Sequence, residues 1–202
     1  MIFKYNFIFD TKLIQNFIKN KELKILDFGC GTGIWPKNDL ENRNIKKIIL
    51  YDKNKKLIRI LKEKYNQKKV EINFNFKDII KKKNYNLIIM SSVIQYMSIT
   101  EFKKLINIIS QNKKKRKRGL FIIITDIPIL PRFLEFVLLP FFNLKRFFFV
   151  FTMIFNNKYK KLNFYLHKKK DFYFLKNKFK ILFAQNMHDL KYLRYSLFLK
   201  SK

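Results

Sequence analysis

Glycine is rare in this chain, and most of it falls at one point. Three of the four glycines among the 202 residues are Gly29, Gly31 and Gly33. They directly follow Lys24–Phe28, a short apolar run with the composition of a buried strand. Glycine permits the backbone angles of a sharp turn and lets a ligand approach the main chain closely. A strand that runs into such a turn is typical of nucleotide-binding α/β folds, whose ligands lie at the carboxyl ends of parallel strands.

Strand-like and helix-like patterns alternate over the first 126 residues. The helical segments are Lys55–Tyr65, with apolar residues at helical spacing, a helix that begins at a Ser98 and Glu101 capping box, and a short helix start at Trp35 and Pro36. This order predicts βαβ units and a mostly parallel sheet. The strand-like segments are Lys24–Phe28, Ile48–Tyr51, Val70–Phe76, Leu87–Ser91 and Leu120–Thr125.

The composition changes after the fifth strand-like segment. Residues 128–168 are rich first in Phe and then in Lys, and we expect them to form an insertion or cap before the last helix. For residues 129–155, core-covering helices, a lid over a substrate pocket and an amphipathic element on a membrane all remain open. After this segment, recognisable helix and strand patterns resume, with a helix predicted over Lys170–Lys178 and strands over Phe179–Ala184 and Arg194–Leu199. We therefore expect a single domain over residues 1–202.

The net charge of +31 suggests a nucleic-acid or anionic-membrane partner at first sight. The abundance of Lys, Asn, Ile and Phe, all with A/T-rich codons, explains this bias without a function. The single cysteine excludes an internal disulfide and a Cys-based zinc site. No run reaches the roughly 18–20 apolar residues of a spanning helix, and no leader is evident, so we expect a cytoplasmic protein, with peripheral membrane contact through residues 129–155 as the alternative.

The residues of the turn distinguish between nucleotide ligands. A dinucleotide fingerprint needs glycine where this chain has Ile34, and the Gly-Lys-Ser/Thr ending of a P-loop is absent. Asp27 instead places a carboxylate beside the turn. That group would repel a pyrophosphate and would suit a ligand with a positive centre and a free amino group. S-adenosylmethionine has both, so Asp27 is interpreted as the anchor of its amino-acid end.

Further carboxylates fall at the predicted carboxyl edge of the sheet. Asp52 ends the second strand, where it suits two hydrogen bonds to ribose hydroxyls. Asp78 follows the third strand, where it could accept a hydrogen bond from the adenine amine. Asp126 ends the fifth strand. Together with Asp27, these residues place four of the 14 acidic side chains at one edge.

On these residues the chain resembles the class I S-adenosylmethionine-dependent methyltransferases over residues 20–127. The glycine turn resembles the first motif of the family, Ile49–Asp52 the ribose-binding motif, Phe76–Ile79 the adenine-binding segment and Tyr85–Tyr96 the fourth-strand motif. Asn86 departs from the family, since many members have Asp there. The resemblance implies an α/β, Rossmann-like, seven-stranded and mostly parallel sheet with helices on both faces and an antiparallel last strand. It implies S-adenosylmethionine as cofactor, held by Asp27, Gly29, Cys30, Gly31, Gly33, Asp52, Lys53, Asp78, Ile79 and Ser91.

The acceptor of the methyl group is less well defined by the sequence. Ser91 and Ser92 end the fourth strand, which argues against a metal held there, and the Asn/Asp-Pro-Pro-aromatic motif of nucleic-acid amino methyltransferases is absent. The similarity of this strand end and of Thr125–Pro128 to small-molecule and glycan-biosynthesis enzymes favours a small-molecule or glycan-precursor acceptor. An RNA methyltransferase and a non-catalytic binding module that retains the fold are the alternatives.

No catalytic base stands out. Tyr96, Asp126 and His167 are the candidates, and His188 is as plausible as His167. The basic segment Lys158–Lys170 could bind an anionic substrate. The run Lys113–Arg118 is interpreted as a solvated loop at the opposite, amino edge of the sheet.

Overall fold

The computed structural model describes residues 22–33, 44–65, 68–82, 85–111, 119–128, 165, 167–186 and 194–202. Several of the predictions above lie outside these residues. They are the helix start at Trp35 and Pro36, the loop Lys113–Arg118, segment 129–155, nearly all of the predicted cap and His188.

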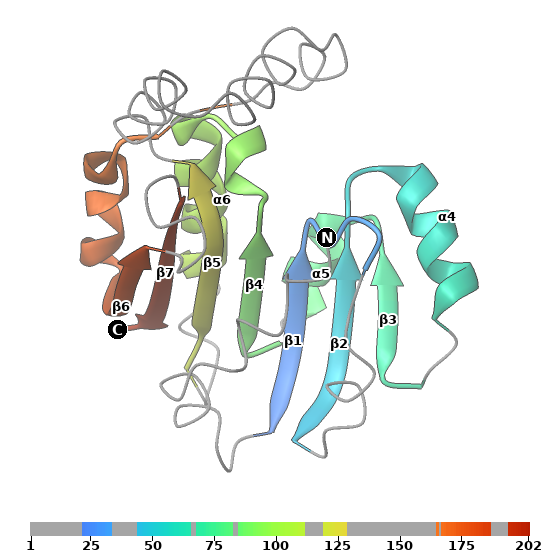
Figure 1. Ribbon diagram of the computed structural model, residues 1–202. Coiled ribbons are helices and arrows are strands. Elements are labelled where there is room, and N and C mark those ends of the chain that lie inside the picture. The colour runs from blue at the N-terminus through green and yellow to red at the C-terminus, as the bar shows by residue number, and fades with distance from the viewer. Residues whose placement is uncertain are drawn as a thin grey trace, which may run out of the picture. The chain divides into compact units, whose positions relative to one another are not determined.

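Seven strands form one sheet in the order β3-β2-β1-β4-β5-β7-β6 (Figure 1). β1 pairs in parallel with β2 and with β4, and β2 pairs in parallel with β3. The end of β7 lies beside the start of β5, because Ser201 N donates to Leu120 O at 2.8 Å, and this is the antiparallel arrangement predicted for the last strand. The strands are β1 (Leu23–Phe28), β2 (Ile45–Tyr51), β3 (Val70–Asn73), β4 (Leu87–Ser91), β5 (Phe121–Pro128), β6 (Phe179–Asn186) and β7 (Arg194–Ser201).

Helical segments connect these strands. The α-helices are α4 (Lys55–Lys64), α5 (Phe76–Lys82) and α6 (Ile99–Gln111), and the 3-10 helices are η1 (Ile94–Tyr96) and η4 (Lys169–Asn177). The predicted capping box begins α6, since Ser98 Oγ accepts from Glu101 N at 3.2 Å and Glu101 Oε2 accepts from Ser98 N at 2.7 Å. The helix predicted near Lys170–Lys178 is present, but as a 3-10 helix.

The third strand is shorter than the sequence pattern indicates. It ends at Asn73, so the prediction of a strand through Phe76 is wrong for its last three residues. Asn73 Oδ1 accepts a hydrogen bond from Asn75 N at 2.8 Å, and Asn75 Oδ1 accepts one from Lys77 N at 3.1 Å. Such side-chain bonds to the backbone two residues on turn the chain and begin a helix. The alternation of apolar residues therefore continues past the point where the strand ends.

The elements pack as two compact units, each with its own core. The first contains β1 to β4, α4, α5 and the start of β5, and the second contains η1, α6, the rest of β5, η4, β6 and β7. In the first unit every residue of β4 is buried, as in a central parallel strand. From β1 the chain continues to β2 and, through α4, to β3 at the edge of the sheet, and it then returns through α5 to β4 on the other side of β1. Because both crossovers are right-handed and run in opposite directions across the sheet, α4 and α5 lie on opposite faces of these strands.

Asn86 joins β4 to the start of β1. Its Oδ1 accepts from Lys24 N at 2.9 Å, and its Nδ2 donates to Glu22 O at 2.7 Å. A carboxylate at this position could accept the first bond but could not donate the second. The departure from the Asp found in many family members therefore has a structural reason in this chain.

The Asn86→Asp substitution is expected to lower the free energy of unfolding by about 1 kcal/mol, because one donor is lost and a negative charge faces the Glu22 carbonyl. Urea denaturation at neutral pH measures this change. Asn54→Asp is the matched control, since the Asn54 side chain caps α4 as an acceptor alone, and it should leave the stability unchanged or slightly raised. Equal losses in the two variants would contradict the assigned role of the Asn86 amide.

Candidate cofactor-binding site

The glycine turn follows β1 and is held by the end of β2. Gly29, Gly31 and Gly33 have φ angles of 71°, 61° and 59°, in the left-handed region that favours glycine. Gly29 N and Cys30 N both donate to Tyr51 O, at 2.8 and 3.0 Å, and Gly33 N donates to Cys30 O at 3.0 Å. The predicted strand-to-turn geometry is therefore present, at the carboxyl end of a central strand.

Asp52 connects this turn to the start of α4. Its Oδ2 accepts from Gly31 N at 3.0 Å, and its Oδ1 accepts from Asn54 N at 2.8 Å. A carboxylate offers about four lone-pair sites, and these two bonds occupy one on each oxygen. Within the described residues, each oxygen of Asp52 thus retains one acceptor site. Two acceptor sites on one half-buried carboxylate suit two neighbouring hydroxyl groups, such as those of a ribose.

Four of the five backbone amides of the turn, residues 29–33, are already bonded within the protein. Those of residues 29, 30, 31 and 33 all donate within the protein, to Tyr51 O, Asp52 Oδ2 and Cys30 O. Phosphate-binding turns instead direct several backbone N–H groups at the ligand. This geometry agrees with the argument from Asp27 that the turn does not bind a pyrophosphate.

The end of α4 supports the other side of the turn. Lys64 Nζ donates to Gly33 O at 3.1 Å, and the Tyr65 hydroxyl donates to the same carbonyl. Lys64 Nζ also donates to Thr32 O at 3.4 Å. A Cβ atom on Gly33 would overlap Leu61 Cδ2, so a larger residue would have to displace the buried Leu61 side chain, and the φ of 59° also favours glycine at this position. Tyr65 was predicted only as part of a helical segment, and no contact of Lys64 with the turn was predicted from the sequence.

Three aromatic rings cluster on one side of the turn. Phe28 ends β1, Tyr51 ends β2 and Phe76 begins α5, and their ring centroids lie 4.9 to 5.5 Å apart. Burial, and secondarily the Asp52 carboxylate, raises the pKa of the Tyr51 hydroxyl above its ordinary value. The raised pKa keeps the Tyr51 hydroxyl neutral well above neutral pH, beside the Asp52 carboxylate. Sequence reasoning missed this cluster, although the parallel register that pairs Phe28 with Tyr51 could have indicated it.

The other predicted cofactor residues differ in their surroundings. Asp27 is 1 % exposed and pairs in register with Leu50 and Ile89 on the flanking strands. Ser91 is buried at the end of β4, as predicted. Cys30 and Ile79 are also buried, whereas Lys53 and Asp78 are exposed.

Asp78 follows β3, as predicted, and lies in the first turn of α5. An acidic residue there favours the helix through the helix dipole, whether or not a ligand binds. A role in adenine binding stays a prediction.

The candidate bases belong to the second unit. Tyr96 ends η1 and is 39 % exposed, and Asp126 lies within β5. His167 is 2 % exposed, and its Nε2 lies 3.0 Å from Ile94 O. Within the described ranges, no three His, Cys, Asp or Glu side chains are grouped so that they could hold a metal ion. In the same ranges, no helix has the length and apolar character needed to cross a membrane.

Comparison with known proteins identifies the family. The profile of the methyltransferase small domain matches residues 10–129. Because the match covers more than half of the chain, the protein belongs to this family, among the class I S-adenosylmethionine-dependent methyltransferases. No curated protein sequence matches the chain.

Solved structures resemble the chain in fold. A magnesium protoporphyrin IX methyltransferase from Synechocystis PCC 6803 with bound S-adenosylhomocysteine has a TM-score of 0.57 at 15 % identity, over 96 % of this chain and 78 % of that one. An S-adenosylmethionine-dependent methyltransferase from Methanosarcina mazei has a TM-score of 0.60 at 13 % identity, over 93 % and 96 %. The N-methyltransferase NodS from Bradyrhizobium japonicum WM9 has a TM-score of 0.55 at 9 % identity, over 96 % and 90 %. These likenesses confirm the predicted Rossmann-like fold.

Proposed function

We propose that this methyltransferase transfers the methyl group of S-adenosylmethionine to a small-molecule or glycan-precursor acceptor. The observation that carries the cofactor site is Asp52, which fixes the glycine turn through Gly31 N and, counting bonds among the described residues, retains one acceptor site on each carboxylate oxygen. Bound S-adenosylmethionine supplies a sulfonium-activated methyl group. The residues of the chain supply its binding and orientation.

The residues present fit the parts of this cofactor. Asp52 would accept hydrogen bonds from the two ribose hydroxyls, and the buried carboxylate of Asp27 would attract the methionine ammonium. The buried side chain of Ile79 and the exposed carboxylate of Asp78, both at the start of α5, are the predicted adenine contacts. In a methyl transfer of this kind, holding donor and acceptor in line supplies much of the rate, and a base is needed only if the acceptor must lose a proton.

The proposed acceptor class rests on the residues at the end of β4 and on two of the structural neighbours. Ser91 and Ser92 replace the Pro-Pro-aromatic motif of many nucleic-acid amino methyltransferases. The Synechocystis neighbour acts on magnesium protoporphyrin IX, and NodS is an N-methyltransferase. A cytoplasmic site of action remains part of the proposal.

Calorimetric titration with S-adenosylmethionine, S-adenosylhomocysteine and NAD tests the cofactor. We expect micromolar binding of the first two ligands and no binding of NAD, because four amides of the described turn, residues 29–33, already donate within the protein. A folded chain that binds neither sulfur ligand would contradict the enzymatic function and leave a binding module that retains the fold.

Transfer of tritiated methyl groups tests the acceptor. We expect label in the small-molecule or glycan-precursor fraction of a cell extract. Label in RNA, with RNA binding that weakens steeply as salt rises, would instead support the RNA alternative.

A further inference from the structure

The short helix η1 follows β4 on the side of the sheet where parallel strands present their ligands. The chain enters it through Ser92, which has a φ of 56° although it is not glycine. Residues in this left-handed region cost about 1–2 kcal/mol and persist only where the surroundings hold them. Ser92 N donates to Thr125 O at 3.2 Å, which fixes this entry against β5.

η1 cannot be stable by itself. It has three residues, and its internal bonds are those from Tyr96 N to Val93 O at 2.9 Å and from Met97 N to Ile94 O at 3.0 Å. A single 3-10 turn of this kind has poor hydrogen-bond geometry and needs support from elsewhere in the fold. The residues that supply the support therefore determine where Tyr96 lies.

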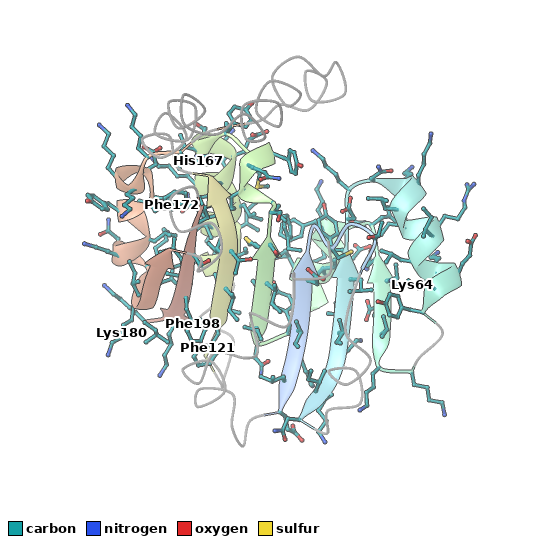
Figure 2. The ribbon with its side chains drawn as sticks, in the orientation of Figure 1. Lys64, Phe121, His167, Phe172, Lys180 and Phe198 are labelled. Atoms are coloured by element: carbon teal, nitrogen blue, oxygen red, sulfur yellow. The ribbon has the colours of Figure 1, made fainter. Side chains whose placement is uncertain are left out.

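Two backbone carbonyls of η1 receive hydrogen bonds from a segment about 70 residues further along the chain. Tyr165 N donates to Gln95 O at 2.8 Å, and His167 Nε2 lies 3.0 Å from Ile94 O. His167 is 2 % exposed, and its ring packs against Phe172 of η4 at a centroid distance of 5.6 Å (Figure 2). The imidazole is therefore held between η4 and the Ile94 carbonyl.

The partner of His167 determines its tautomer. A carbonyl oxygen can only accept, so Nε2 carries the proton, and in the neutral ring Nδ1 holds the lone pair. A base that acts through Nε2 is then excluded, because that nitrogen has no lone pair to offer. This is a different role from the catalytic one considered for His167 on sequence alone.

We infer that His167 is a positioning residue, which together with the Tyr165 amide fixes η1 and so sets the place of Tyr96, one of the candidate bases. The catalytic part of this inference rests on the proposed function. The bonds to η1 do not depend on it. Tyr165 and His167 belong to the end of the predicted cap, so this part of the cap contacts the turn that follows β4.

The tautomer can be measured on the unaltered protein by ¹⁵N NMR of the imidazole nitrogens, with His167→Gln used to assign the signals. We expect Nε2 to carry a proton, because it faces the Ile94 carbonyl. A neutral ring protonated at Nδ1 would overturn the inference without any folding question.

Hydrogen exchange tests the support given to η1. In His167→Leu, the amides of Tyr96 and Met97 should exchange at least about fivefold faster, as loss of one hydrogen bond implies. His167→Gln places an amide donor close to the position of Nε2 and should restore most of the protection. Unchanged exchange in the Leu variant, or no recovery in a Gln variant that melts like the wild type, would overturn the inference.

S-adenosylhomocysteine titration of the same variants separates the two proposals. We expect wild-type affinity in both, since the assigned cofactor residues all lie in the first unit. Failure of the wild type to bind would contradict the proposed function and leave the tautomer and exchange results standing.

Discussion

The Gly33→Ala substitution is expected to abolish measurable S-adenosylhomocysteine binding and to lower the free energy of unfolding by about 2–4 kcal/mol. Two costs add. The φ of 59° is unfavourable for any residue with a Cβ atom, and that atom would overlap Leu61 Cδ2 of α4. Relief of the overlap would move the fully buried Leu61 side chain, α4, or the turn whose carbonyl receives Lys64 and Tyr65. Thermal or urea denaturation, with calorimetric titration of the ligand, measures both effects.

Gly31→Ala is the matched control. Its φ of 61° is nearly the same, but a Cβ atom there meets no atom within 4 Å. The free energy of unfolding should therefore fall by only about 1–2 kcal/mol, the backbone cost alone. Equal losses at the two positions would show that contact with α4 does not require glycine at residue 33.

The Asp52→Ala substitution is expected to weaken S-adenosylhomocysteine binding by at least about tenfold, or 1.4 kcal/mol. It removes the two remaining acceptor sites for the ribose and leaves Gly31 N and Asn54 N without their shared partner. Calorimetric titration at constant salt measures the affinity, and the melting temperature reports the loss of the two backbone bonds.

Glu63→Ala controls for the change in net charge. Glu63 is an exposed carboxylate on α4, so its loss should leave the affinity within about twofold, as expected for a screened surface charge. An affinity unchanged in Asp52→Ala, or reduced equally in both variants, would contradict the ribose-binding role of Asp52.

The sheet could be predicted because its strands are strongly apolar and end in recognisable turns. The run Leu87–Ser91 has the predicted bounds, and the glycine turn follows β1 as expected. The prediction failed after β3, where the Asn73 and Asn75 side chains begin a helix within a pattern that still alternates. Hydrogen bonds from a side chain to the nearby backbone leave little trace in the apolar pattern of a sequence, but they determine where a strand ends and a helix begins.

Many residues of the candidate site could be predicted from the sequence, but most of the contacts between them could not. Asp52 was identified as a ligand-binding carboxylate, but its bonds to Gly31 N and Asn54 N depend on how two strand ends meet. Lys64 and Tyr65 reach the turn from the far end of a helix, and His167 reaches Ile94 across 73 positions of the sequence. Contacts of this kind follow from tertiary packing, which no local spacing reveals.

The closed hydrogen bonding of the glycine turn has a consequence for how a ligand would bind. Four of its amides are already bonded before any ligand arrives, and its last carbonyl is held by α4. The turn is thus preorganised, so its conformational entropy is lost during folding instead of during association. Because the turn needs little rearrangement, it should not slow association. Differences in affinity at this end of the site should then lie mainly in the dissociation rate constant of the ligand.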